Sequence, residues 1–162
     1  MNRFSRPMLL AFLLALAANA QAAVDVQRNV TLTDDAGGTL VITTQGTLEI
    51  GGSESLTTAE FDGFQPNADG RTIDGQMVRS RYRDLDELVT TYDGLLESES
   101  TDADGNPVIN TLVLENLQVR RDGDGPEFSG QVTWNGETVD AAELPPQAIY
   151  ILRRALRFFR FA

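Results

Sequence analysis

Residues 95–140 of the chain read LLESESTDADGNPVINTLVLENLQVRRDGDGPEFSGQVTWNGETVD. Three turn-like segments interrupt this stretch, at 101–107, 122–126 and 135–136. Each contains an Asn-Gly or Asp-Gly pair, and such pairs tolerate the positive φ angles of a tight hairpin connection. The segments between them, 108–119 and 127–134, are rich in β-branched and aromatic residues, which favour strands. The stretch therefore predicts an antiparallel meander, in which each strand pairs with its neighbour in sequence.

Apolar and polar residues continue to alternate with a period of two over 24–50 and 71–83, which is typical of half-buried antiparallel strands. The segment 51–70 is rich in glycine and polar residues, and we expect a long connection there. In 84–92, Asp84 followed by Glu87 resembles a helix capping box, whereas Thr90 and Thr91 favour a strand. The pattern of 84–92 predicts a short helix.

The tail of the chain has a helical period. After the prolines at 145 and 146, apolar residues of 147–161 cover one half of a helix, and the other half carries Arg153, Arg154, Arg157 and Arg160. The consecutive apolar residues 112–114 in the central strand indicate a second layer over the sheet, which this helix would supply. The alternative is a basic amphipathic helix in peripheral contact with an anionic membrane, or in the groove of a partner. The acidic remainder of the chain favours docking of this basic helix onto the chain's own sheet.

We therefore expect a mainly β (α+β) fold, an antiparallel β-meander sheet with a C-terminal amphipathic helix at 146–160 packed on it. Residues 1–22 have the features of a cleaved signal peptide, because Arg3 and Arg6 precede an apolar run and small residues follow it at 18–22. The run is shorter than the roughly 20 residues that span a bilayer. The mature chain, 23–162, is expected to be a single β-rich domain.

This signal is of the general secretory (Sec) type, since it has no twin-arginine pair and no cysteine follows the apolar run as a lipid anchor would require. The expected location is therefore periplasmic or secreted. The chain has no cysteine, so no disulfide staples the fold even though an oxidising compartment would allow one.

Composition excludes several functions. The chain contains no Cys, His or Lys, and these residues supply most nucleophilic mechanisms and most zinc and copper ligands. The formal net charge is −11, and loss of the two arginines of 1–22 brings it to −13. A chain so acidic is a poor partner for nucleic acid, because phosphate binding requires dense positive charge. Carboxylate chemistry and oxygen-ligand cations remain.

Three arginines are the candidate ligand-binding residues. Arg79, Arg81 and Arg83 fall on one face of the strand expected at 71–83, where a row of guanidinium groups suits an anionic ligand. The alternative is structural. Glu97 and Glu99 have matching parity on the following strand, so that a ladder of Arg–Glu pairs across the sheet fits the pattern.

The candidate metal residues are Asp102, Asp104 and Asn106, whose spacing is that of the first three oxygen ligands of a calcium loop. The rest of the loop departs from that pattern, because Pro107 stands where glycine is needed. The plain alternative is that Asp and Asn are good turn residues. A weaker candidate set comprises Asp122, Asp124 and Glu127.

No motif in the chain indicates a particular reaction or ligand. The primary hypothesis is a small exported protein of the bacterial envelope that acts as a non-catalytic binding or structural module and needs no cofactor. Its partner would be an envelope protein or an anionic ligand. One alternative is a calcium-stabilised surface or adhesion module, in which Ca²⁺ is held by the turn residues. The second alternative is a carboxylate-dependent glycan hydrolase, which requires two carboxylates that flank one cleft.

Overall fold

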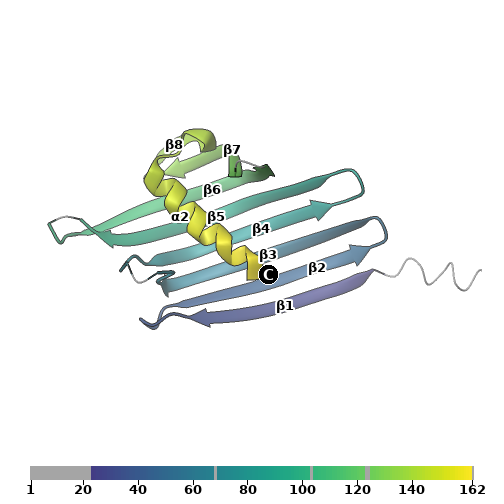
Figure 1. Cartoon of the computed structure of the whole chain (residues 1–162), viewed down its shortest axis with the longest axis horizontal. Helices are drawn as coiled ribbons and strands as arrows, with labels where there is room; N and C mark the ends of the chain where they lie inside the picture. The colour runs from purple at the N-terminus through teal and green to yellow at the C-terminus, as the bar shows by residue number, and fades with distance from the viewer. Residues whose placement is uncertain (1–22, 68, 103, 123–124, 162) are drawn as a thin grey trace, which may run out of the picture.

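The computed structural model describes residues 23–161 except 68, 103, 123 and 124 (Figure 1). The segment predicted as a signal peptide, 1–22, lies outside the described residues. The strands are β1 (Val24–Thr33), β2 (Thr39–Glu49), β3 (Gly52–Phe64), β4 (Ile73–Arg83), β5 (Leu88–Thr101), β6 (Pro107–Asp122), β7 (Gly125–Trp134) and β8 (Glu137–Asp140). A 3₁₀ turn η1 (Ala141–Glu143), the helix α2 (Pro146–Phe158) and a 3₁₀ turn η2 (Phe159–Phe161) follow.

All eight strands form one antiparallel sheet in the order β1-β2-β3-β4-β5-β6-β7-β8. Each strand pairs with its neighbour in sequence, so the expected meander is confirmed. The Asn135-Gly136 turn has positive φ angles at both residues, 49° and 87°, as a tight hairpin between β7 and β8 requires. The C-terminal helix is confirmed as well, and it crosses one face of the sheet diagonally (Figure 1).

The connection predicted at 51–70 is wrong, because β3 occupies most of that segment. β3 pairs with β2 from Gly52 to Asp62 and pairs with β4 on its other side. Its core-facing positions include Thr57 and Ala59, both fully buried. A polar residue and a small one at these positions hide the apolar alternation by which a strand is recognised in sequence.

The short helix predicted at 84–92 is also wrong. Residues 84–87 form the hairpin loop between β4 and β5. The Asp84 carboxylate accepts hydrogen bonds from the main-chain N–H groups of Asp86 (2.9 Å) and Glu87 (2.7 Å). These are the bonds that an N-cap residue makes, but here they close an Asx turn, and the chain continues as a strand.

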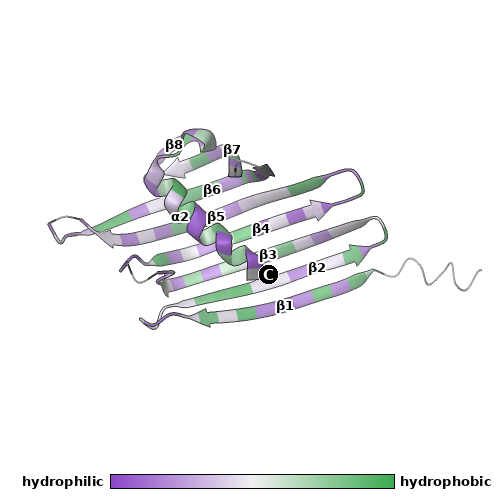
Figure 2. Ribbon diagram, viewed as in Figure 1, coloured by the Kyte–Doolittle hydropathy of each residue, from purple (hydrophilic) through white to green (hydrophobic). Residues whose placement is uncertain are grey.

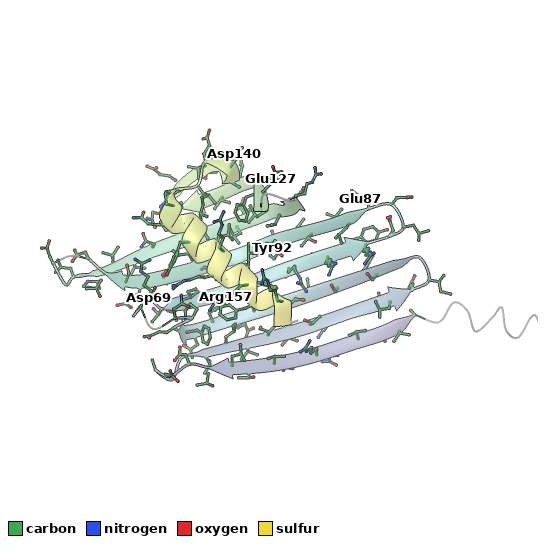
Figure 3. The ribbon with its side chains drawn as sticks, in the orientation of Figure 1. Asp69, Glu87, Tyr92, Glu127, Asp140 and Arg157 are labelled. Atoms are coloured by element: carbon green, nitrogen blue, oxygen red, sulfur yellow. The ribbon has the colours of Figure 1, made fainter. Side chains whose placement is uncertain are left out.

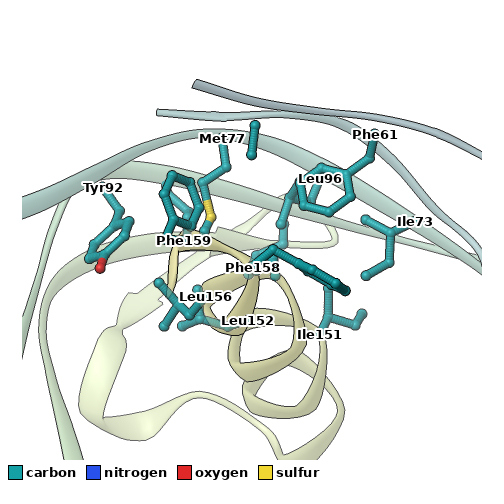
Figure 4. Packing of buried hydrophobic residues seen from close by; sticks show 14 of the residues in the cluster. Phe61, Ile73, Met77, Tyr92, Leu96, Ile151, Leu152, Leu156, Phe158 and Phe159 are labelled. Atoms are coloured by element: carbon teal, nitrogen blue, oxygen red, sulfur yellow. The ribbon is translucent and has the colours of Figure 1, made fainter. Parts of the chain in front are cut away.

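α2 and the sheet enclose the hydrophobic core (Figure 4). We call the face of the sheet under α2 the helix side and the opposite face the open face. The buried side chains of the helix segment are Ala148, Ile151, Leu152, Ala155, Leu156, Phe158 and Phe159. Phe158 packs edge-on against Phe61 and Phe64, with ring centroids 6.2 Å and 5.3 Å away. Burial of each large apolar side chain contributes about 1.5–3 kcal/mol, so this contact is the main source of stability.

The β3–β4 loop fixes α2 from one flank. Arg154 of α2 forms an ion pair of 2.9 Å with Asp69, and the Tyr150 hydroxyl donates a hydrogen bond of 2.7 Å to the same carboxylate. Arg157 donates to the carbonyl of Pro66 at 2.8 Å. Hydrogen bonding from Arg154 lowers the pKa of Asp69 from its usual 3.8 to about 2, with Tyr150 acting in the same direction. We call Asp69 with these two partners the latch.

Charge is divided between the two faces of the sheet. The strand register places the acidic residues of β1 to β5 on the open face, namely Asp25, Glu49, Glu54, Glu60, Asp62, Asp74, Asp93, Glu97 and Glu99. Basic residues of the same strands, namely Arg28, Arg79, Arg81 and Arg83, share the helix side. The hydropathy colouring in Figure 2 shows hydrophilic and hydrophobic residues alternating along the strands and interspersed along α2. The helix side is therefore apolar and basic in a strongly acidic chain.

α2 covers only part of the helix side. It ends over the middle of the sheet, and the start of β1 with the β2–β3 and β4–β5 hairpins extends past it (Figure 1). We call this region the bare end. Its exposed apolar residues are Val24, Val26, Leu48, Ile50, Leu85 and Leu88, between 40% and 87% exposed. Among the described residues, no helix is long and apolar enough to cross a membrane.

Candidate functional site: a basic groove between helix and sheet

A groove of about 1200 Å³ lies between α2 and the part of the sheet formed by β4 to β7. Tyr92, Val119 and Phe128 of the strands line one wall, and Leu156 and Phe159 of the helix segment line the other. The groove exists because two strands separate. β5 pairs with β6 from Thr91 onward, so 88–90 have no β6 partner among the described residues.

Arginines dominate the charge of this groove. Five line it, namely Arg79, Arg81, Arg120, Arg153 and Arg160, against two acids, Glu87 and Glu127. Within the described part of the chain the single ion pair is that of the latch, so none of these five arginines is neutralised by a carboxylate in direct contact. The groove is therefore a cationic opening with aromatic and aliphatic walls. Figure 3 shows Tyr92 on one flank of α2, with Asp69 of the latch and Arg157 on the other.

Arg79 is the arginine built most firmly into the fold. Its guanidinium donates to the carbonyl of Phe159 at 3.0 Å and to the Thr57 hydroxyl at 3.1 Å, and lies 5.4 Å from the centre of the Phe159 ring. It therefore caps the C-terminal end of the helix, where a cation is favoured. Its Nε is buried and has no hydrogen-bond partner in the described part of the molecule.

The environment of Arg79 is that of a partly desolvated cation. Burial lowers the pKa of its guanidinium, Tyr92 opposes that shift, and the positive charge of Arg81 lowers the pKa further. Arginine stays protonated at physiological pH despite such shifts. An anion that entered the groove would relieve the repulsion between the two guanidinium groups.

The four arginines of α2 and η2 fall into two pairs. Arg154 and Arg157 point toward the β3–β4 loop, where they hold the helix in place. Arg153 and Arg160 are exposed and line the groove on the other flank. Arg153 lies in α2, and Arg160 lies seven residues later in η2, the 3₁₀ turn that continues the helix.

The arginines predicted from the sequence are partly brought together by the structure. Arg79 and Arg81 line the groove, whereas Arg83 lies one pleat further toward the bare end and does not. The alternative ladder of Arg–Glu pairs is wrong. The β4–β5 register places Arg79, Arg81 and Arg83 opposite Tyr92, Thr90 and Leu88. In the same register Glu97 lies opposite Asp74 on the open face.

Sequence reasoning missed Arg120, Arg153 and Arg160 as parts of the site. A signal for two of them was present, because positions 153 and 160 share one line of the helix and 154 and 157 share another. No comparable signal marks Arg120, which reaches the groove only because β5 and β6 separate.

The predicted calcium residues lie in the β5–β6 hairpin loop. Asp102 accepts hydrogen bonds from the N–H groups of Asp104 (2.9 Å) and Asn106 (2.8 Å), and its other oxygen accepts from the Asn106 amide (3.2 Å). The backbone hydrogen bond from Asn106 and the other bonds of the loop lower the pKa of Asp102. Asp102 thus acts as a turn-forming residue in this structure.

No group of three acidic side chains that would hold a metal ion occurs among the described residues. Of the weaker set, Asp124 lies outside the described residues, and the side chain of Asp122 is not described.

A second hollow, of about 730 Å³, lies on the opposite side of the sheet from the bare end and is lined mainly by residues of the open face. Asp25, Glu54 and Tyr82 are among its lining residues. It is bordered by polar side chains of the sheet and lacks the second layer that α2 supplies to the groove.

Comparisons with known proteins yield no relative for this chain. No family model matches it, and neither the curated proteins nor the solved structures contain a significant match. The class that the fold itself defines is a helix-covered antiparallel meander.

Proposed function

We propose that this chain is an exported, non-catalytic binding module of the cell envelope, and that the groove between α2 and the sheet holds an anionic ligand with an apolar part. The observation that carries this proposal is the groove itself. Five arginines without an ion pair in the described residues stand around walls that include Tyr92, Phe128 and Phe159. Ligand sites are usually concave and apolar with a few placed polar groups, and this groove has that composition.

The charge pattern supports an anion over other ligands. The acidic strand residues of β1 to β5 face the open face, so the helix side presents a local positive field in a chain of net charge −11. Concave sites lined by one sign of charge attract ligands of the opposite sign and raise their association rate. The aromatic walls add the apolar contact that a simple inorganic ion would not use.

Export and the absence of catalysis are supported by sequence features. The first support is the signal-peptide pattern of 1–22. The second is the absence of His, Cys and Lys, which leaves the groove with no imidazole, thiol or amine.

The test compares two fluorescent probes of nearly equal shape. 1-Anilinonaphthalene-8-sulfonate is an apolar anion, and N-phenyl-1-naphthylamine is its uncharged counterpart. We expect the anion to bind the folded chain more tightly, and dodecanoate to displace it. The double variant Arg153→Gln/Arg160→Gln should weaken anion binding by about tenfold, since hydrogen bonds to charged groups are worth about 1.5–3 kcal/mol. Binding of the neutral probe should change by less than about twofold.

The matched control is Arg28→Gln/Arg83→Gln. It removes the same charge from exposed positions of the helix side that do not line the groove, and it should leave both affinities unchanged. Equal binding of the two probes, or equal weakening by the two double variants, would refute the proposal. Urea unfolding of each variant establishes that the fold is intact.

Glycan hydrolysis is the second candidate, because Glu87 and Glu127 both line the groove. A hydrolase of this type needs one carboxylate on each side of the scissile bond. Turnover of purified cell-wall glycan that is lost in both Glu87→Gln and Glu127→Gln would replace the binding-module proposal with this one.

The calcium-stabilised module remains an alternative that thermal unfolding tests. We expect no rise in melting temperature on addition of Ca²⁺, because the loop's own N–H groups already occupy the Asp102 carboxylate. A rise that Asp102→Ala and Asp104→Ala together abolish would establish the calcium site instead.

A further inference from the structure

The two edges of the sheet are unlike. β8 has four residues and leads directly into η1 and α2, so that edge is short. β1 has ten residues and pairs with β2 from Val24↔Leu48 to Thr33↔Thr39 without a bulge. It contains neither proline nor lysine, which are common devices against edge-to-edge pairing. Its outer side is unpaired among the described residues.

The hydrogen bonding of the β1–β2 hairpin determines which main-chain groups of β1 point toward β2 and which point away from the sheet. The N–H of Asp34 donates to the carbonyl of Gly38 at 3.0 Å, so position 34 directs its main-chain groups toward β2. These directions alternate along an antiparallel strand. The odd positions of β1 therefore present their N–H and C=O groups outward, and these positions are Asp25, Gln27, Asn29, Thr31 and Thr33.

We propose that β1 pairs antiparallel with β1 of a second copy of this chain, about a two-fold axis at Asn29. On the open face, this register sets Gln27 opposite Thr31. On the helix side, it sets Val26 opposite Leu32 and Arg28 opposite Val30. The paired stretch is 25–33, nine of the ten residues of β1.

Other registers fit less well. An axis at Arg28 also pairs nine residues, 24–32, but it places two arginines directly opposite each other, which is destabilising. Axes at Gln27 and Val30 each shorten the paired stretch to seven residues of β1, 24–30 and 27–33. The Asn29 register is thus the longest that avoids contact between like charges.

The packing of β1 also favours a second copy. Val24 and Val26 are 57% and 40% exposed on the helix side, whereas Val30 and Leu32 pack at the margin of the core. Pairing about Asn29 brings Val26 of each copy against Leu32 of the other. The two-fold axis stands perpendicular to the sheet, so two eight-stranded sheets become one of sixteen strands with both helices on the same side.

The dimer is expected to be weak. A nine-residue strand pair is about 30 Å long, and a single such pair is smaller than a standard stable interface. Each copy carries a formal charge of −11, so the copies repel at low ionic strength. Because salt screens that repulsion, association should strengthen as the NaCl concentration rises from about 20 to 300 mM.

Disulfide trapping tests the register directly, since the chain has no cysteine of its own. Cα atoms of a hydrogen-bonded antiparallel pair lie about 5.5 Å apart, which is within the range that a disulfide bridges. Under mild oxidation Asn29→Cys should therefore form a covalent dimer on a non-reducing gel. Thr31→Cys alone should stay monomeric, because the two copies of position 31 lie about 13 Å apart in this register.

An equimolar mixture of Gln27→Cys and Thr31→Cys should form the mixed dimer, since these positions are opposite each other. Sedimentation of the unaltered chain should show a monomer–dimer equilibrium that shifts toward the dimer with salt. Cross-linking of Thr31→Cys as readily as Asn29→Cys would overturn the proposal. So would an unaltered chain that stays monomeric at about 500 μM in both salt concentrations. Neither readout depends on the anion groove.

Discussion

The strands β1 to β5 pass through two regions that differ in what covers them. Under α2, Leu40 and Ile42 of β2 are at most 1% exposed, whereas Leu48 of the same strand and the same face is 50% exposed at the bare end. The strand pairing is equally regular in both regions. A regular ladder of backbone hydrogen bonds therefore does not by itself define the stable part of this sheet. The stable part of the sheet is defined by burial of its side chains against α2.

This difference has consequences for both dynamics and function. Regions with few buried apolar contacts open at lower free energy than the core. The bare end is such a region, and it includes the outer half of β1. The groove lies where the two regions meet, with Arg79 under the helix end and Arg81 exposed beyond it.

The largest expected effect comes from a matched pair of leucines. Leu152→Ala in α2 removes a fully buried side chain and should lower the free energy of unfolding by about 3–5 kcal/mol. Leu88→Ala at the bare end, where the side chain is 54% exposed, should cost less than about 1 kcal/mol. Urea unfolding measures both. Equal losses would mean that the bare end is covered in solution, which would break the comparison.

A pair of glycines tests the backbone of the same two regions. Gly94 lies in the covered part of β5 with φ of +146°, and an added Cβ would collide with the carbonyl oxygen of Gln76. Gly51, in the β2–β3 hairpin, has φ of +101° but open space around it. Gly94→Ala should therefore destabilise the fold by about 1–3 kcal/mol, and Gly51→Ala by about 1 kcal/mol, from backbone strain alone. A larger loss at Gly51 would contradict the assignment of the covered region as the more constrained one.

The latch gives the smallest effect and a pH signature. Asp69→Asn should lower stability at pH 7 by about 0.5–1 kcal/mol, because the ion pair with Arg154 is partly exposed. The pKa of Asp69 is depressed to about 2, so its contribution is fully present above pH 3.8 and is lost as the pH falls through about 2. The difference between the two proteins should thus shrink over that window.

The control is Asp86→Asn in the β4–β5 hairpin of the bare end, whose carboxylate makes no hydrogen bond or ion pair in the described part of the chain. It should leave stability unchanged within about 0.5 kcal/mol at either pH. A latch variant that behaves like this control would show that Asp69 does not anchor the helix.

The parts of the fold predicted from sequence are those with a strong local signal. The hairpins of residues 95–140 were readable because Asn-Gly and Asp-Gly pairs specify their own turns, as at Asn135. The helix was readable because its apolar residues recur with the helical period. β3 could not be predicted from the sequence, because Thr57 and Ala59 occupy core positions at which a large apolar residue would reveal the strand alternation. At Asp84, the same hydrogen bonds serve a helix cap and a hairpin turn, so the local sequence is ambiguous.

The groove was only half predictable, for a different reason. Arg79 and Arg81 share a strand face, which alternation reveals. Their partners Arg153 and Arg160 come from a segment some 70 residues later, and their position depends on which way the helix rolls on the sheet. The contact between Asp69 and Arg154 contributes to that orientation, and it leaves no mark in the local pattern of either segment.

The strictly sequential order of the sheet also shapes how the chain reaches this structure. Because each strand pairs with the one before it, the hairpins can form in turn from the N-terminus as the chain emerges, with short loops to close at each step. The core cannot close in this way. Phe61, Met77 and Leu112 belong to the core that α2 closes, and α2 follows all of these strands in the sequence, so the three side chains stay solvent-exposed until α2 folds back over the sheet.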